Sequence, residues 1–269
     1  MNAKTKIPYI PDRCYEYPMT SNARLDYRIL IAAPADEPPP SGYAVVYALD
    51  GDALFRALAE AVRLQTRKPK GYDPILVVGI GYPSREPFDF ERRCRDFTMP
   101  ADEASLPVRP DGKPWPPHGE ADRFLDFIEN ELMPAVAAEW PIDPARQAIA
   151  GHSLGGLLTL HALFARPRLF THYVSGSPSV WWGNGEVLKE LERFKQTWQG
   201  EHPLHLLLAI GANELEDMLE GAEKVAEGLR PLAQQNVYMK HVKFADEEHV
   251  SVLPAILGRI PRFLWSDRR

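Results

Sequence analysis

Cysteine is nearly absent from this chain, which has only Cys14 and Cys94 among its 269 residues. Two cysteines are too few for a disulfide scaffold, and their spacing is not that of a zinc site. Long hydrophobic runs are also missing, since no stretch approaches the roughly 18 apolar residues that a membrane helix needs. The sequence therefore predicts a protein that folds around an ordinary hydrophobic core and does not insert into a membrane.

An excess of one charge sign is also lacking. The chain has 37 acidic and 31 basic residues, for a net charge of −6, and no long run of either sign. Because nonspecific binding to nucleic acids needs a basic face, a nucleic-acid partner is not expected. The first residues contain lysines but no apolar segment of the kind found in signal peptides. We expect a cytoplasmic protein, with a processed periplasmic protein as the alternative.

Segments with the patterns of strands and helices alternate along the chain. Strands are predicted at 27–34, 43–49, 74–83, 146–151, 202–211 and 237–245 and at the start of 171–182, and helices at 53–64, 120–140, 153–165, 185–198, 216–235 and 251–265. This alternation predicts an α/β fold, a mostly parallel sheet with helices on both faces.

We expect one domain over 1–269, with an N-terminal arm at about 1–26 and a loop insertion at about 84–119. The insertion is rich in arginine and irregular in pattern, and its part 98–119 contains several prolines. Proline content of this kind favours a shaped loop over a freely moving lid.

Ser153 lies in the segment GHSLG, between a predicted short strand and a predicted helix. This is the G-x-S-x-G nucleophile elbow in its required context. The tight turn gives the serine a positive φ, and Gly151 and Gly155 are small enough not to clash with it. The serine would stand at a helix N-terminus, where the N–H of Leu154 could hold a developing negative charge. The alternative is a joint in which the glycines serve only close packing.

His249 is the best candidate for the base that a nucleophilic serine needs. It follows the last predicted strand, where the chain order nucleophile, acid, base of α/β-hydrolases places the histidine. The acid should follow the preceding strand, and Glu214 stands there, on the turn after Gly211. Glu216 is the second candidate, although a carboxylate there could simply favour the first turn of the helix. A serine–histidine dyad without an acid is the third.

A second donor to the oxyanion should come from the loop after the strand at 43–49. The segment LDGD contains the glycine and the helix start that such a loop requires. We predict that the backbone N–H of Asp52 is this donor. The alternative for Asp52 is a side chain that caps the helix at 53–64.

Several segments together resemble the bacterial esterase family that includes the enterobactin and ferric-siderophore esterases, within the α/β-hydrolase superfamily. They are VVYALDGDALF, VVGIGYP, RRCRDFTMP, ADRFLDFIENELMP, IAGHSLGGLLTLHALF, FTHYVSGSPSVWW and EEHVSVLP. The resemblance covers about 27–265 and implies an α/β-hydrolase fold. It also implies ester hydrolysis, with Ser153 and His249 at the matching catalytic positions.

The substrate that this resemblance implies is a cyclic or linear catechol–serine ester, with or without bound iron. Arg95, Trp181 and Trp182 would suit such an anionic aromatic ligand through ion pairing and ring stacking. The alternative is that Arg95 and Asp96 form a structural network around core tryptophans. Arg92 and Arg93 are expected on a solvated surface.

The predicted reaction passes through an acyl-enzyme and needs no metal or organic cofactor. A general carboxylesterase or thioesterase and an acyltransferase of the same fold are the alternatives. A noncatalytic ligand-binding module is a more distant one, because a serine, a histidine and a carboxylate are all present.

Overall fold

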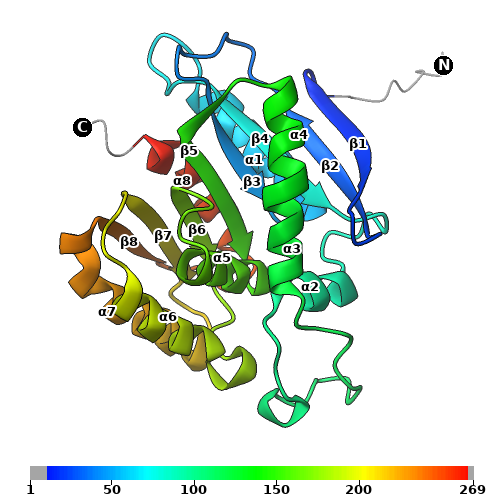
Figure 1. The fold of residues 1–269 in the computed structure, drawn as a ribbon, viewed down its shortest axis with the longest axis vertical. Helices are drawn as coiled ribbons and strands as arrows, with labels where there is room; N and C mark the ends of the chain where they lie inside the picture. Colours follow the sequence, from blue (N-terminus) through cyan, green and yellow to red (C-terminus); the bar gives the residue numbers. More distant parts are fainter. Residues whose placement is uncertain (1–10, 266–269) are drawn as a thin grey trace, which may run out of the picture.

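The computed structural model describes residues 11–265, which build a central sheet of eight strands between two layers of helices (Figure 1). The strand order is β1-β2-β4-β3-β5-β6-β7-β8. β2 is antiparallel to both of its neighbours, and all other pairs are parallel. The strands are β1 (Cys14–Thr20), β2 (Asp26–Ala32), β3 (Tyr43–Ala48), β4 (Ile75–Gly81), β5 (Ile142–His152), β6 (His172–Gly176), β7 (Leu204–Gly211) and β8 (Val237–Phe244). The mostly parallel α/β sheet that the sequence predicts is confirmed.

The helices cover both faces of the sheet, as predicted. They are α1 (Gly51–Gln65), α2 (Phe90–Phe97), α3 (Ala121–Phe127), α4 (Met133–Glu139), α5 (Leu154–Ala165), α6 (Glu186–Thr197), α7 (Glu216–Leu229) and α8 (Leu253–Leu264). α1 and α8 share one apolar core with the sheet, behind it in Figure 1, and α3, α5, α6 and α7 form the larger core in front of it. Every residue of β3 and β4 is buried, as expected for parallel strands covered on both faces.

The helix predicted at 120–140 contains an irregular turn. α3 and α4 are joined by a π-helical turn at Ile128–Leu132, so the chain continues without a break but changes its hydrogen-bond pattern. Pro134 lies in the first turn of α4, and proline has no N–H to donate to the preceding turn. The π turn lies directly before it, where the regular pattern would be interrupted.

The sequence predicts an N-terminal arm at about 1–26, but residues 14–20 of this segment form the edge strand β1. β1 pairs along its whole length with β2. It is mostly exposed and contains Pro18, and proline is tolerated only at the edge of a sheet. Because most of β1 is exposed, its sequence lacks the clear alternation of apolar and polar residues that marks a half-buried strand. The first ten residues of the predicted arm lie outside the described residues.

The segment 84–119 also differs from the prediction, because it contains the helix α2. The side chain of Asp89 accepts a hydrogen bond from the N–H of Arg92 and caps this helix. The rest of the segment projects beyond the end of the sheet at which the parallel strands finish (Figure 1). Arg93 is buried, not solvated, and Arg92 is only partly exposed. The helix could not be recognised from its sequence because its arginines suggest a solvated surface. In the structure Arg92 and Arg93 are paired with Asp96 and Asp50 inside the protein.

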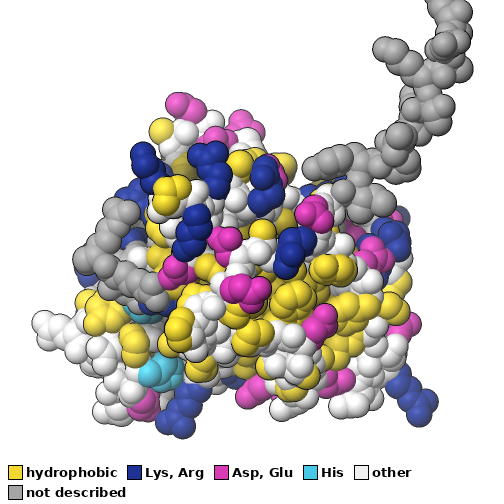
Figure 2. Space-filling view, turned by 90° about the horizontal axis from the view of Figure 1, so that it is seen from above, with side chains coloured by type: hydrophobic (Ala, Val, Ile, Leu, Met, Phe, Trp, Pro, Cys, Tyr) yellow, Lys and Arg dark blue, Asp and Glu magenta, His cyan; other side chains and the backbone are white. Residues whose placement is uncertain are grey.

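Charges of both signs are mixed on the face at which the parallel strands begin, with no large region of one sign (Figure 2). No helix among residues 11–265 is long and apolar enough to cross a membrane. The opposite face, where the parallel strands end, carries the predicted functional residues. Asp52, Ser153, Glu214 and His249 follow β3, β5, β7 and β8, so four loops converge there.

Candidate active site

Ser153 connects β5 to α5 in a strained conformation, with φ 61° and ψ −117°. Such values are rare for a residue with a side chain and are typical of the nucleophile elbow. Gly151 is required by the turn, because a Cβ there would lie 2.3 Å from the carbonyl oxygen of Gly155. The predicted elbow is thus present in the structure.

The second glycine of the motif is less constrained than expected. A Cβ on Gly155 would make only ordinary contacts, at 3.5 Å from Asp50 and Leu49. Gly156 is the one that packs closely, since a Cβ there would lie 2.5 Å from the carbonyl oxygen of Gly176. The predicted steric conflict at the serine turn therefore does not explain why residue 155 is glycine. Gly156 lets α5 approach the end of β6.

Glu214 and His249 are in direct contact. The Nδ1 atom of His249 lies 2.7 Å from Oε2 of Glu214, whose side chain is completely buried. Glu214 lies on the turn between β7 and α7, while Glu216 is exposed as the first residue of α7. Of the two predicted acids, the geometry favours Glu214.

The other carboxylate oxygen of Glu214 is held by two donors. Oε1 accepts a hydrogen bond from the hydroxyl of Ser177 and another, of 3.1 Å, from the N–H of Gly211. Burial raises the pKa of Glu214, but the hydrogen bonds from His249, Ser177 and Gly211 outweigh it, and the pKa is lowered. Glu214 is therefore an ionised group with a fixed orientation.

The His249 ring lies against the nucleophile elbow. Its centroid is 4.6 Å from that of His152, the residue directly before Ser153. The His249 side chain is 40% exposed, so it is open to a ligand that enters from solvent. His152 is buried, and its burial together with the nearby His249 and Arg93 lowers its pKa to about 3. His152 is neutral near pH 7 and adds no charge beside Ser153.

Three serines after β5 were not singled out from the sequence, although they surround the predicted site. Ser175 donates a hydrogen bond of 2.9 Å to the carbonyl oxygen of Gly156 at the start of α5. Ser177 holds Glu214, as described above. The Ser179 hydroxyl oxygen lies 3.3 Å from that of Ser153. The alternation in SGSPS, at the end of β6, is the only sequence signal that could have pointed to them.

The predicted oxyanion donors stand at two helix starts. Leu154 is the first residue of α5 and Asp52 the second residue of α1, and N–H groups in a first helical turn have no acceptor within their helix. The Asp52 side chain does not cap α1. It pairs with Arg28 and accepts a hydrogen bond of 3.0 Å from the N–H of Tyr82. The N-cap residue is Asp50.

The three candidate substrate-binding residues have different environments. Trp182 is fully buried and donates its indole N–H to the carbonyl oxygen of Met99, so a role in stacking on a ligand is wrong for this residue. Arg95 pairs with Glu120 at 3.0 Å, which neutralises its charge. Trp181 is partly exposed and remains open to a ligand.

Among residues 11–265, no group of three or more histidine, cysteine or carboxylate side chains could hold a metal ion. Cys14 and Cys94 are both free thiols, and burial raises the pKa of Cys94 to about 11. Neither cysteine is a nucleophile at neutral pH. The chemistry available at this face is that of a serine, a histidine and a buried carboxylate.

Residues 23–216 match the family described as "Putative esterase". The ferri-bacillibactin esterase BesA of Bacillus subtilis is 42% identical over 250 residues, 90% of this chain and 86% of that protein. The siderophore enterobactin esterase of Emericella nidulans is 35% identical over 243 residues, 80% of each chain. The crystal structure of the BES protein from Bacillus cereus matches with a TM-score of 0.89 and 36% sequence identity. The match covers 97% of this chain and 98% of that chain. The chain therefore belongs to this family of esterases, which have the α/β-hydrolase fold.

Proposed function

We propose that this protein hydrolyses a carboxylic ester through an acyl-enzyme formed on Ser153. The observation that carries the proposal is the 2.7 Å contact between His249 and the buried Glu214, beside the elbow that presents Ser153. A carboxylate on Nδ1 keeps the proton on that nitrogen, which leaves Nε2 free to accept the serine proton.

In the proposed reaction, the Ser153 Oγ attacks the ester carbonyl carbon while His249 takes the hydroxyl proton. The oxyanion that forms is held by the backbone N–H groups of Leu154 and Asp52. When the C–O bond to the alcohol breaks, His249 returns the proton to the leaving oxygen. Water then attacks the acyl-enzyme by the same route and releases the acid and free Ser153.

We propose further that the ester belongs to a siderophore, a catechol–serine trilactone or its linear form with or without iron. The names of the two relatives support this substrate class. A cluster of aromatic rings, formed by Phe90, Trp115 and Trp181 and called the aromatic rim below, supports it as well. Neighbouring rings of the rim have centroids 5.9 and 6.1 Å apart.

Trp181 brings one end of the aromatic rim toward the nucleophile. Trp181 is two residues after Ser179, whose hydroxyl is next to that of Ser153. Arg109 lies 4.8 Å from the centre of the Phe90 ring and is paired with Asp111 at 2.7 Å. Flat rings and a guanidinium group suit an anionic catecholate.

The test of the catalytic proposal is Ser153→Ala. We expect this variant to lose hydrolysis of p-nitrophenyl esters by at least about 10⁴-fold and to lose labelling by a fluorophosphonate. Turnover that persists in the variant would refute Ser153 as the nucleophile. For the substrate, initial rates are compared on an iron-loaded catechol trilactone, its linear forms, short acyl esters and S-formylglutathione. Equal slow rates on all of them would contradict the siderophore assignment.

A further inference from the structure

The ion pair between Asp50 and Arg93 lies beside the elbow and has no part in the proton transfers above. The Arg93 Nε donates to Oδ1 of Asp50 at 2.8 Å, and its Nη2 donates to the carbonyl oxygen of His152 at 3.2 Å. The Asp50 side chain is completely buried and that of Arg93 is 10% exposed. One guanidinium group therefore joins the loop after β3 to the end of β5.

Both of these segments carry a proposed oxyanion donor. Asp50 comes two residues before Asp52, and His152 comes two residues before Leu154. The distance between the two N–H groups thus depends on how the segments are held relative to each other. A guanidinium is planar and rigid, so its two hydrogen bonds set that relation more tightly than a flexible ammonium group would.

Asp50 needs outside support for its conformation. Its φ of 49° and ψ of 50° are left-handed, which is unfavourable for a residue with a side chain. In this conformation its carbonyl oxygen accepts the N–H groups of Ala53 and Leu54 and starts α1. Burial raises the pKa of Asp50 to about 6, and Arg93 opposes that shift. Within the described chain, Oδ2 of Asp50 has no hydrogen-bond partner, so the carboxylate depends on Arg93.

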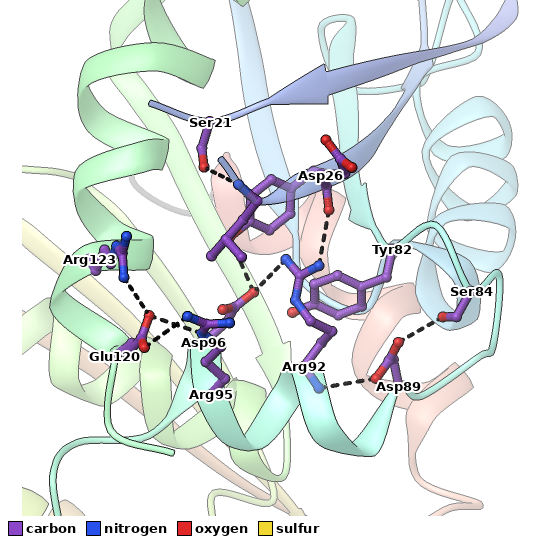
Figure 3. A network of polar contacts seen from close by, with 12 residues as sticks. Ser21, Asp26, Tyr82, Ser84, Asp89, Arg92, Arg95, Asp96, Glu120 and Arg123 are labelled. Carbon is purple, nitrogen blue, oxygen red and sulfur yellow. Dashed lines mark hydrogen bonds and ion pairs between the residues drawn. The ribbon is translucent and has the colours of Figure 1, made fainter. Parts of the chain in front are cut away.

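The helix that carries Arg93 is itself anchored. Arg92, its neighbour on α2, lies 4.8 and 4.6 Å from the ring centres of Tyr27 and Tyr82. It also pairs with Asp96 at 3.3 Å, and Asp96 accepts a hydrogen bond from the Tyr27 hydroxyl. Figure 3 shows this network between α2, β2 and β4. Because α2 is held in this way, the guanidinium of Arg93 has a fixed point of attachment.

We propose that Arg93 is a positioning residue that sets the geometry of the oxyanion hole by joining Asp50 to the carbonyl of His152. This proposal rests on the proposed function, in which the backbone N–H groups of Asp52 and Leu154 hold the oxyanion. It assigns to Arg93 no contact with substrate. Its loss should slow the step in which the oxyanion forms, and it should leave ground-state binding of the ester unchanged.

The test uses Arg93→Met, Arg93→Lys and the double variant Asp50→Asn/Arg93→Met, with a p-nitrophenyl ester and a fluorophosphonate. For Arg93→Met we expect kcat to fall about 10²-fold with KM within about threefold, and fluorophosphonate labelling to slow by a similar factor. Arg93→Lys keeps the charge beside Asp50 but cannot span both contacts, and its kcat should be about tenfold below wild type.

The double variant separates positioning from stability. It leaves no uncompensated buried charge, and asparagine tolerates the left-handed conformation of residue 50. We expect its melting temperature to approach that of the wild type while kcat stays about 10²-fold low. A double variant with wild-type kcat would overturn the proposal, because the pair would then only balance charge. An Arg93→Lys variant with wild-type kcat would overturn it too.

Arg166→Met is the matched control. Arg166 also pairs with two carboxylates, those of Asp122 and Asp126, but these are exposed and lie at the other end of α5, about 20 Å from Ser153 at 1.5 Å per residue. We expect this control to lose stability and to keep kcat. Failure of the proposed function is detected separately, by activity that persists in Ser153→Ala. A loss of activity in Ser153→Ala with normal activity in the Arg93 variants would reject the positioning role alone.

Discussion

His249 and His161 both contact carboxylates, so the same chemical groups meet in two different surroundings. His249 is 40% exposed at its side chain, and Glu214 is its only carboxylate partner in the described chain. His161, on α5, is buried between two carboxylates, at 2.9 Å from Glu190 and 3.4 Å from Asp122. The two pairs differ in exposure and in the number of acids.

This difference decides what each histidine can do. Burial alone would lower the pKa of His161, but its hydrogen bonds to Asp122 and Glu190 outweigh burial and raise the pKa to about 9. A histidine that is already protonated at pH 7 cannot act as a base, so His161 serves as a cation that ties α3, α5 and α6 together. One carboxylate on Nδ1 and an open Nε2 are what a base requires, and His249 has both.

The largest expected effect comes from replacing the two histidines in parallel. His249→Ala should lower kcat for ester hydrolysis by at least about 10⁴-fold, because no other group can take the serine proton. His161→Gln should leave kcat within about twofold and reduce the melting temperature. Steady-state kinetics and thermal unfolding of both variants check this. Comparable activity losses in the two would break the distinction between them.

The carboxylates provide the next comparison. In Glu214→Gln the amide oxygen should stay with the N–H of Gly211, so the amide NH₂ faces His249 and imposes the wrong ring tautomer. We expect a loss of about 10³–10⁴-fold in kcat from this change. Glu190→Gln and Glu216→Gln should keep kcat near wild type. A large effect of Glu216→Gln together with a small one of Glu214→Gln would reassign the acid.

A smaller effect is expected for Ser177→Ala. Since its hydroxyl lowers the pKa of Glu214, its loss should raise that pKa and move the acidic limb of the kcat profile to higher pH. We expect kcat at pH 7 to fall about tenfold, the order of one lost hydrogen bond to a charged group. Ser175→Ala is the control, because Ser175 contacts Gly156 and not Glu214. Equal pH profiles for both variants would contradict the role of Ser177.

The smallest effect on activity, and a clear one on stability, concerns the pH response of His161. Its pKa is raised from 6.5 to about 9 on folding, so the folded protein binds an extra proton between these values. The resulting stabilisation is complete below pH 6.5 and is lost as the pH rises through about 9. The free energy of unfolding should fall by on the order of 3 kcal/mol over this range. Denaturant unfolding at several pH values measures it, and His161→Gln should remove this part of the slope.

Much of the fold could be predicted from local patterns. Buried parallel strands have continuous apolar sequences, and β3 and β4 were recognised in this way. The elbow was recognisable because its backbone conformation demands a glycine at 151. β1 and α2 were missed, since an exposed edge strand and a helix rich in arginine lack the apolar periodicity that marks buried elements.

In the candidate site, too, some residues could be predicted from the sequence and others could not. Ser153, His249 and a short list of acids follow from chain order alone. The choice of Glu214 depends on a contact across 35 residues of chain, and the fixed orientation of Glu214 depends on Ser177 in the loop after β6. The sequence predicts that Trp182 faces a ligand, but Trp182 is buried. The prediction was wrong because the sequence alone does not reveal which parts of the chain cover a tryptophan.

The sequence by itself determined the alternation of the buried strands and their helices, the strained serine turn and the edge of the sheet at which the reactive residues gather. These properties depend on periodicity and backbone sterics, which are local. Only the tertiary structure decided that Glu214 pairs with His249, that His161 is held as a cation and that Arg93 joins Asp50 to the carbonyl of His152. Charge, pKa and orientation depend on burial and on partners distant in the chain, and no local pattern records them.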